Sequence, residues 1–238
     1  MSRSLPRPSR LPNAREAATA TAAALALALV LGLFVKVADL LAERHAGLID
    51  NTVLDEAVEH RGPFLTAFME AVSTAAEIPL LATAALVALA IAWRTRSWRP
   101  VIVTAGAGAL SVALATLVKE VAARTRPPLA TAIVQETGFS FPSRHTTVAA
   151  ALLLAAAYLL ARRARTRTGA TTWWITALAL SALVAASRVY LGVHWATDVT
   201  AGLALGAAAA LALITTDLGY GLWACRDTGP EAGGSSHK

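Results

Sequence analysis

The sequence predicts an all-α fold in which six transmembrane helices form a bundle. Of the 238 residues, 56% are hydrophobic and only 15% are charged, whereas soluble domains average about 25% charged residues. The apolar residues are grouped in runs that approach the ~20 residues with which an α-helix crosses the hydrocarbon core. The six segments are residues 17–41, 67–93, 100–118, 146–161, 172–186 and 195–214.

Two of these segments carry a weaker signal than the others. Glu70 and Glu77 interrupt the first half of the second segment, and the fourth is short unless its helix begins before Thr146. A short hydrophobic core still spans, because the bilayer can thin around it. Alanine dominates all six segments, which favours close helix packing through small side chains.

The loops between the segments alternate in charge. Arginines lie before the first segment at positions 3, 7, 10 and 15, between the second and third at 94, 96 and 99, and between the fourth and fifth at 162, 163, 165 and 167. The loop at 43–61 instead holds five carboxylates, at positions 43, 50, 55, 56 and 59, and few cations. Because short loops rich in Lys and Arg stay in the cytoplasm, we expect both termini to be cytoplasmic and the loop at 43–61 to be external.

The pattern divides the chain into three parts. These are a flexible cytoplasmic N-terminus at 1–16, a six-helix membrane domain at 17–216, and a cytoplasmic, partly disordered tail at 217–238. An alternative for the N-terminus is a signal peptide with a basic region at 3–15, although no small-x-small cleavage site follows it. Cys225 is the single cysteine, which excludes an internal disulfide and a cysteine-based zinc site.

Five cations break this charge pattern, because the predicted topology places them at the external ends of the helices. They are Lys119, Arg124, Arg126, Arg144 and Arg188. A single such residue is usually an anchor that extends to the headgroup layer, and we interpret Arg124 in this way. Several together indicate a site for a polyanion such as phosphate, at the extracytoplasmic helix ends.

The spacing of polar residues supports a chemical site there. Lys119 and Arg126 are seven residues apart and share a face if the third helix continues. Ser143 is a natural N-cap for the fourth helix, whose first amides can bind an anion. His194 and Asp198 are four residues apart, so the carboxylate can accept the Nδ1 hydrogen and leave Nε2 free as a nucleophile or base. Such a pair is often only a polar contact between helices, but beside several cations it indicates catalysis.

Three motifs in these regions together resemble the phosphatase signature of the type 2 phosphatidic acid phosphatase superfamily. The signature reads Lys-x6-Arg-Pro, Pro-Ser-Gly-His and Ser-Arg-x5-His-x3-Asp. The matching residues are, motif by motif, Lys119, Arg126 and Pro127; Pro142, Ser143, Arg144 and His145; and Ser187, Arg188, His194 and Asp198. Arg144 stands where the signature has Gly.

The resemblance implies roles for seven residues. His194 would attack phosphorus and form a phosphohistidine, Asp198 would orient it, and His145 would protonate the leaving oxygen. The phosphate would be held by Lys119, Arg126, Ser143 and Arg188. We expect no metal and no other cofactor, because these cations supply the positive charge and the sequence has no cluster of carboxylates to bind a metal. Arg144 is expected to point to the headgroup layer or, alternatively, to contact a second phosphate.

The resemblance therefore implies an integral phosphatase of the bacterial cytoplasmic membrane, acting on a lipid phosphate or lipid diphosphate at the outer face without metal. Undecaprenyl diphosphate, phosphatidic acid and phosphatidylglycerol phosphate are candidate substrates, entering between the third and fifth helices. Vanadium haloperoxidases resemble the same signature but are soluble. A non-catalytic protein of this fold that binds or transports a lipid phosphate is the other alternative, and it would tolerate loss of His194, His145 or Asp198. The net charge of +6 requires no nucleic acid partner.

Overall fold

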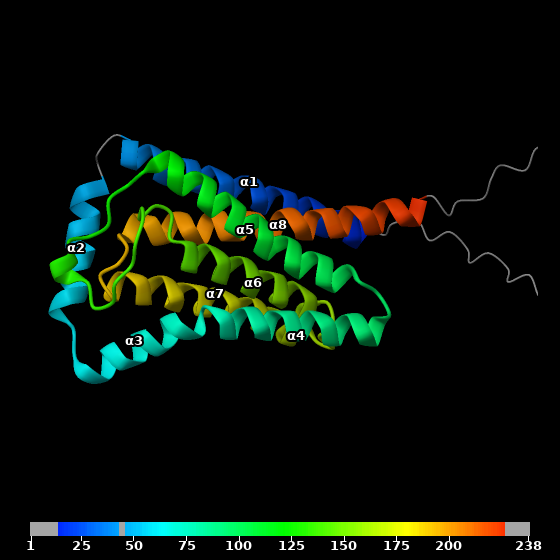
Figure 1. Ribbon diagram of the computed structural model, residues 1–238. Helices are drawn as coiled ribbons and strands as arrows, with labels where there is room; N and C mark the ends of the chain where they lie inside the picture. The colour runs from blue at the N-terminus through cyan, green and yellow to red at the C-terminus, as the bar shows by residue number, and fades with distance from the viewer. Residues whose placement is uncertain (1–13, 43–45, 227–238) are drawn as a thin grey trace, which may run out of the picture.

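The computed structural model describes residues 14–42 and 46–226, and every regular element in these residues is a helix. In chain order the elements are α1 (Ala14–Ala42), α2 (Ala46–Glu59), α3 (Pro63–Ala75), α4 (Ile78–Thr95), α5 (Arg99–Ala122), the 3-10 turn η1 (Leu129–Thr131), α6 (Arg144–Ala161), α7 (Arg167–Tyr190) and α8 (Ala196–Arg226). Figure 1 shows the long helices running side by side, with α2 lying across one end of the bundle. The predicted all-α fold is confirmed.

Six of these helices are long and apolar enough to cross a membrane: α1, α4, α5, α6, α7 and α8. α6 begins at Arg144 and so reaches 18 residues, which gives the fourth predicted segment a spanning length. α7 and α8 extend beyond the predicted fifth and sixth segments. The predicted termini at 1–16 and 217–238 fall mostly outside the described residues, and the described part of the second, 217–226, continues α8.

The second predicted segment, 67–93, is wrong as a single helix. The structure divides it into α3 and α4, and only α4 has spanning length. The break lies at Ala76 and Glu77, where Glu77 leaves helical geometry with φ −92° and ψ −119°. Pro79 follows in the first turn of α4, a position that suits proline because the amide hydrogen it lacks would have no partner there. The break places Glu77 at a helix end, where it joins the cluster described below.

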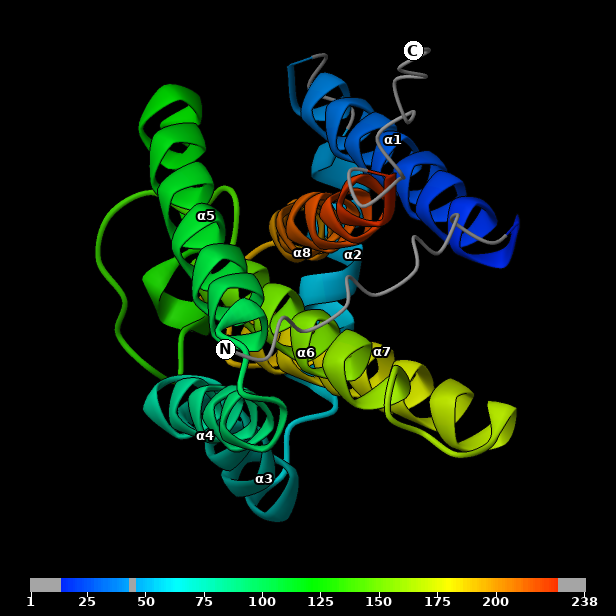
Figure 2. The same cartoon turned by 90° about the vertical axis from the view of Figure 1, so that its right-hand side faces the viewer.

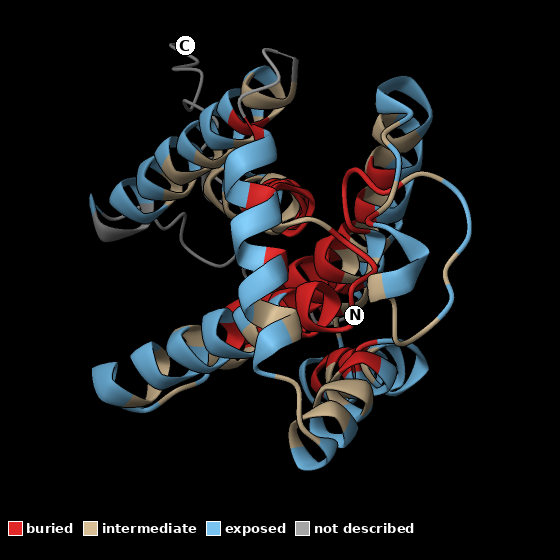
Figure 3. Cartoon of the chain, turned by 90° about the vertical axis from the view of Figure 1, so that its left-hand side faces the viewer, coloured by how far each residue is buried: buried red, intermediate tan, exposed pale blue. Residues whose placement is uncertain are grey.

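The segment at 43–61 is also different from the loop that we expected. Residues 46–59 form α2, whose buried positions are Ala46, Asp50 and Leu54. Positions four residues apart lie on one helical face, so α2 turns a single narrow stripe toward the bundle. It packs against α7 and α8. In Figure 3, which looks onto this end, the buried residues gather behind α2.

The bundle is centred on α6 and α8, the two spans with the largest buried share. α8 packs against α1, α5 and α6, and α6 also packs against α7 (Figure 2). The hydrophobic cluster around these helices contains fully buried alanines, which are Ala107, Ala151, Ala155, Ala209 and Ala210. Small side chains let membrane helices approach closely, as the alanine content predicts.

Gly206 fixes how closely α8 approaches α6. A Cβ atom at this position would lie 2.2 Å from the carbonyl oxygen of Thr147, so the backbone of α6 would have to move. We expect Gly206→Ala to lower the melting temperature in detergent by several degrees, since overpacking costs about 1–3 kcal/mol. Gly219→Ala on the same helix is the control, because nothing lies within 4 Å of a Cβ there. Equal melting temperatures for the two variants would contradict this account.

Candidate active site

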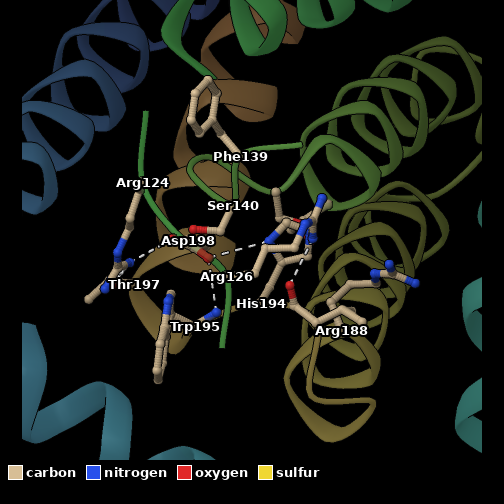
Figure 4. Close-up of polar contacts among 12 residues, drawn as sticks. Arg124, Arg126, Phe139, Ser140, Arg188, His194, Trp195, Thr197 and Asp198 are labelled. Atoms are coloured by element: carbon tan, nitrogen blue, oxygen red, sulfur yellow. Dashed lines mark hydrogen bonds and ion pairs between the residues drawn. The ribbon is translucent and has the colours of Figure 1, made fainter. Parts of the chain in front are cut away.

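The residues singled out from the sequence belong to helix ends and adjoining segments at the end of the bundle that α2 crosses (Figure 1). Lys119 and Arg188 lie in the last turns of α5 and α7. Ser143 precedes α6, and Asp198 lies in the first turn of α8. Four helix ends therefore supply one site, which Figure 4 shows in close-up.

His194 makes the two contacts that a nucleophilic histidine needs. Its Nδ1 lies 3.3 Å from Asp198 Oδ2, and its Nε2 lies 3.3 Å from Arg126 Nη1. Because arginine can only donate, Nε2 is the acceptor and the ring hydrogen is on Nδ1. The same Asp198 oxygen accepts the backbone amide of Trp195 at 2.9 Å, which holds the carboxylate in place. This is the tautomer that the four-residue spacing predicts.

The protonation state of His194 follows from its surroundings. Its side chain is 2% exposed. The pKa of the imidazole is lowered to about 4, chiefly by burial and also by the charges of Arg126 and Arg188, which together outweigh the opposite effect of Asp198. The ring is therefore neutral near pH 7, with a lone pair on Nε2.

Arg126 reaches the site from a loop and not from a helix. α5 ends at Ala122, because Ala123 adopts the left-handed conformation with φ 44°. Our expectation that Lys119 and Arg126 share a helical face is therefore wrong. The two cations still converge, since both donate to carbonyl oxygens of the segment 137–139: Lys119 Nζ to 139 at 2.6 Å, and Arg126 to 138 at 3.0 Å and to 137 at 3.1 Å.

Arg188 enters from α7 and is almost fully buried. Its guanidinium donates to Ser73 Oγ and to Glu136 Oε1. Within the described part of the chain, its Nε has no hydrogen-bond partner. The other oxygen of Glu136 lies 3.4 Å from Arg126 Nη2. The two arginines are thus joined by one carboxylate.

Glu136 is a residue that we did not predict from the sequence. It lies in the loop between α5 and α6 and belongs to none of the three motifs. Burial raises the pKa of its carboxyl group, but the charges of Arg188, His145 and Arg126 outweigh burial and hold this pKa below its usual value. The group is therefore ionised at neutral pH. The sequence feature that could have indicated Glu136 is its position between two cationic motifs, nine residues before His145.

His145 lies in the first turn of α6 and faces the same carboxylate. Its Nδ1 lies 3.9 Å from Glu136 Oε1, and its Nε2 lies 2.6 Å from Glu77 Oε1. Glu77, which we treated only as an interruption of an apolar segment, therefore orients His145. The break between α3 and α4 makes this contact possible.

Ser143 is the N-cap of α6, as expected, but its side chain makes no capping hydrogen bond. Its amide donates to the Asp198 carbonyl oxygen at 3.1 Å, and its Oγ accepts from Thr146 Oγ1 at 3.1 Å. These contacts fix the start of α6 against the start of α8. Arg144 is exposed, and its side chain makes no hydrogen bond to the described residues, so this side chain does not belong to the cluster.

Arg124 is not the interface anchor that we expected. Its Nη1 donates to Asp198 Oδ1 at 2.6 Å and to Thr197 Oγ1 at 2.7 Å. Its Nη2 donates to Asp50 Oδ2 at 2.5 Å, and its guanidinium lies 5.5 Å from the centre of the Trp195 ring. Figure 4 shows Arg124 reaching toward Asp198 and Thr197.

Asp50 completes this network from α2. Its side chain is 1% exposed, and its Oδ1 accepts the backbone amide of Thr197 at 2.9 Å. Asp50 therefore caps the first turn of α8 from another helix. A carboxylate at a buried position of an amphipathic helix indicates such a role. This pattern could not be used in the sequence analysis, because residues 46–59 were treated as a loop.

A pocket of about 380 Å³ opens beside His145. It lies between α4, α5 and α6, and its lining includes Glu77, Leu81, Val112, Arg144 and His145. The expected entrance between the third and fifth spans is wrong, because α6 packs against both α5 and α7 and separates them (Figure 2). Among residues 14–42 and 46–226, no three His, Cys, Asp or Glu side chains are grouped so as to hold a metal ion.

Comparison with known families and curated proteins gives consistent matches. The family model described as PAP2 superfamily matches residues 80–219. Decaprenylphosphoryl-5-phosphoribose phosphatase of Mycobacterium tuberculosis is 37% identical over 131 residues, which are 53% of this chain and 65% of that protein, just under two thirds of its length. Phosphatidylglycerophosphatase B of Bacillus subtilis is 30% identical over 181 residues, 74% of this chain and 88% of that protein.

Two solved structures share the fold. The transmembrane PAP2-type phosphatidylglycerolphosphate phosphatase from Bacillus subtilis superposes with a TM-score of 0.71 at 28% identity, covering 79% of this chain and 95% of that chain. Aquifex aeolicus LpxE superposes with a TM-score of 0.54 at 20% identity, covering 69% of this chain and 94% of that chain. The second match is a likeness of fold alone.

Proposed function

The chain belongs to the PAP2 superfamily, and from this premise we propose that it is a membrane phosphatase that hydrolyses a lipid phosphate. The observation that carries the proposal is the pair of contacts of His194. One ring nitrogen faces Asp198 and the other faces Arg126, each at 3.3 Å. A neutral imidazole with its free lone pair beside a guanidinium is suited to attack a phosphorus atom whose oxygens that cation binds.

The proposed reaction has two steps, in which His194 is the nucleophile. In the first step Nε2 forms a bond to phosphorus, the bond to the lipid oxygen breaks, and His145 gives that oxygen a proton. In the second step water attacks phosphorus, His145 takes a proton from the water, and the bond to Nε2 breaks. Asp198 balances the positive charge that the His194 ring carries while it is phosphorylated.

The phosphate oxygens would be bound by Lys119, Arg126, Arg188 and the start of α6 at Ser143. The Glu136 carboxylate lies between the two arginines, so a phosphate that binds both guanidinium groups must displace it. The cost is offset because a phosphate dianion carries more charge and more acceptor oxygens than a carboxylate. We infer that Glu136 moves away when the substrate binds and forms ion pairs with the two arginines between turnovers.

We infer that the lipid chain enters beside His145. The pocket between α4, α5 and α6 touches Glu77, His145 and Arg144, so a chain lying there would bring its phosphate to the general acid. The relatives are named for phosphoric esters of a polyprenyl sugar and of phosphatidylglycerol, and these names favour a lipid monophosphate over a diphosphate. Undecaprenyl diphosphate and phosphatidic acid remain in the substrate panel.

The test of this function is phosphate release from a panel of lipid phosphates by the detergent-purified protein in EDTA. We expect release to continue without divalent metal, because cationic side chains surround the phosphate. A rapid quench with radiolabelled substrate is expected to trap an acid-labile, base-stable phosphoprotein, as a phosphohistidine is. Strict dependence on Mg²⁺, or a base-labile phosphoprotein, would contradict the mechanism.

We expect activity to persist at mildly acidic pH. A pKa of about 4 for His194 keeps the nucleophile neutral above pH 4, and protonation removes it only below that value. The substrate phosphate has its own second ionisation at about pH 6, for which the profile of kcat/KM against pH must be corrected. The corrected profile should show an acid limb near pH 4 that comes from the enzyme. Arg126→Met removes a charge that lowers this pKa, so its limb should move to higher pH. An enzyme limb near pH 6.5 in the wild type would contradict the assignment.

We further propose that the protein lies in a bacterial cytoplasmic membrane with this site outside and both termini inside. The distribution of arginine supports this orientation. In a Cys225→Ser background, Asn51→Cys on exposed α2 should react with an impermeant maleimide in intact cells. Arg165→Cys, in the loop between α6 and α7, should react only after lysis. The reverse pattern would invert the topology.

A further inference from the structure

We propose that the end of the bundle opposite the His194 site binds an anionic phospholipid, whose head group lies among arginines and whose acyl chain lies in a groove between α5 and α8. This site is separate from the proposed active site and does not depend on its chemistry. Figure 2 looks onto this end, where α4, α6 and α8 finish and α5 begins.

The head-group pocket has a volume of about 160 Å³ and lies where these four helices meet. Its polar lining consists of Arg99, Arg162, Arg163, Asp217 and Tyr158 with Ser97 and Thr95. Three guanidinium groups and one carboxylate line the pocket, so it carries a surplus of positive charge. A negatively charged ligand is the complement of such a lining.

Asp217 fixes two of the arginines without using all of their donors. Its Oδ1 accepts from Arg99 Nε at 2.8 Å, and its Oδ2 accepts from Tyr158 at 2.6 Å and from Arg162 Nη1 at 3.3 Å. The remaining nitrogens of Arg162, Nε and Nη2, make no hydrogen bond to the described residues. Arg163 uses only Nη1, which donates to the Leu159 carbonyl oxygen at 2.8 Å. The unused edges of these two guanidinium groups are the donors that a phosphate accepts in pairs.

An apolar groove continues from this pocket. It has a volume of about 460 Å³ and shares Ser97, Arg99 and Asp217 with the head-group pocket. Farther along it is lined by Ile102, Val103, Leu213 and Tyr220. Ile102 is 62% exposed, so the groove opens sideways, toward the position of lipid chains around α5. A polar cationic pocket continuous with an apolar groove fits an amphiphile better than a free ion.

The position of the site favours a phospholipid of the leaflet at this end. Basic pockets between transmembrane helices bind the head groups of anionic lipids, and each Lys or Arg near the surface strengthens binding roughly fivefold. The proposed substrate phosphate belongs at the other end of the bundle, where His194 lies. A phosphodiester lipid such as phosphatidylglycerol can therefore occupy the arginine pocket while the active site is free.

The test is a titration of the full-length protein with phosphatidylglycerol in phosphatidylcholine nanodiscs or in detergent, with native mass spectrometry as the readout. The test variant is Arg162→Gln/Arg163→Gln. The control is Arg165→Gln/Arg167→Gln, which removes the same charge from the α6–α7 loop and the first residue of α7 but lies outside the pocket. We expect roughly 30-fold weaker binding for the test variant, from the loss of two cations, and nearly unchanged binding for the control.

Four outcomes would overturn the proposal. Equal weakening in both variants would mean that the lipid responds only to the net charge of the surface. Equal binding of phosphatidylcholine would mean that the head-group charge is not recognised, and saturation by inorganic phosphate or glycerophosphoglycerol alone would mean that the groove contributes nothing. His194→Ala should bind phosphatidylglycerol like the wild type; failure there would place the lipid in the active site and leave the arginine pocket without a ligand.

Discussion

Replacing His194 by alanine is expected to lower kcat for lipid phosphate hydrolysis by roughly 10⁴-fold or more, the scale seen when a nucleophile is removed from a catalytic unit. The proposed reaction passes through a bond between Nε2 and phosphorus. Water would have to attack directly in the variant, and no other side chain in the described site presents a free lone pair beside Arg126. The measurement is phosphate release at saturating substrate, with substrate binding followed separately.

The matched control is His60→Ala. His60 lies near the same end of the molecule, but it is exposed, and among the described residues its ring hydrogen-bonds only to Glu56. We expect it to keep wild-type activity. A second variant, His194→Gly, should regain part of its activity when imidazole is added, because the free base can take the place of the missing ring. Persistent activity in His194→Ala, or rescue by non-nucleophilic amines alone, would show that His194 is not the nucleophile.

The core of this site could be predicted because it depends on short spacings. His194 and Asp198 are four residues apart on one helix start, and helix geometry alone brings them together. The prediction that Ser143 is an N-cap likewise needed only local information. The convergence of Lys119 and Arg126 was correct as an outcome, but its stated cause was wrong, since it comes from carbonyl contacts with the segment 137–139 and not from a shared helical face.

The remaining site residues could not be predicted because their roles depend on tertiary contacts. Glu77 is the partner of His145 because the structure divides the predicted second span into α3 and α4, a break that the sequence did not predict. Glu136 sits in a long loop with no periodicity, and its contacts with Arg126 and Arg188 cross between elements. Glu77 weakens the apolar pattern of the predicted second span, and in the structure it marks the end of the spanning helix α4.

The role of Arg124 also depends on tertiary contacts and could not be predicted from the sequence. An arginine at a helix end, outside the motifs, is ordinarily interpreted as a residue that anchors the helix at the membrane surface. That role requires its side chain to be surrounded by solvent or lipid. The structure instead places it between Asp50 and Asp198, whose side chains are 1% and 0% exposed. Two buried carboxylates that share one guanidinium form a unit, and removing its central cation has a larger consequence than removing any single hydrogen bond.

We therefore expect Arg124→Met to cost about 3–5 kcal/mol of stability, because it leaves two buried carboxylates without their counter-charge. Its activity should also fall, since the Asp198 carboxylate that orients His194 loses its Arg124 hydrogen bond. Asp50→Asn should cost less, because the amide can still accept from Thr197. The measurements are denaturant unfolding in mixed micelles and kcat/KM, with Asp55→Asn on the exposed face of α2 as the control.

The double variant Asp50→Asn/Arg124→Met separates a coupled network from two independent contacts. Removing one carboxylate together with the cation leaves Asp198 with fewer like charges nearby, so the double variant should be more stable than the sum of the single losses predicts. If Asp50 acts only by holding α2, its removal should lower stability and leave the pH profile of His194 unchanged. If it acts through Arg124 on Asp198, the acid limb of kcat/KM should shift in Asp50→Asn and not in Asp55→Asn. If the losses of stability are additive and the pH profiles of kcat/KM do not shift, Asp50 serves only as a structural contact between α2 and α8.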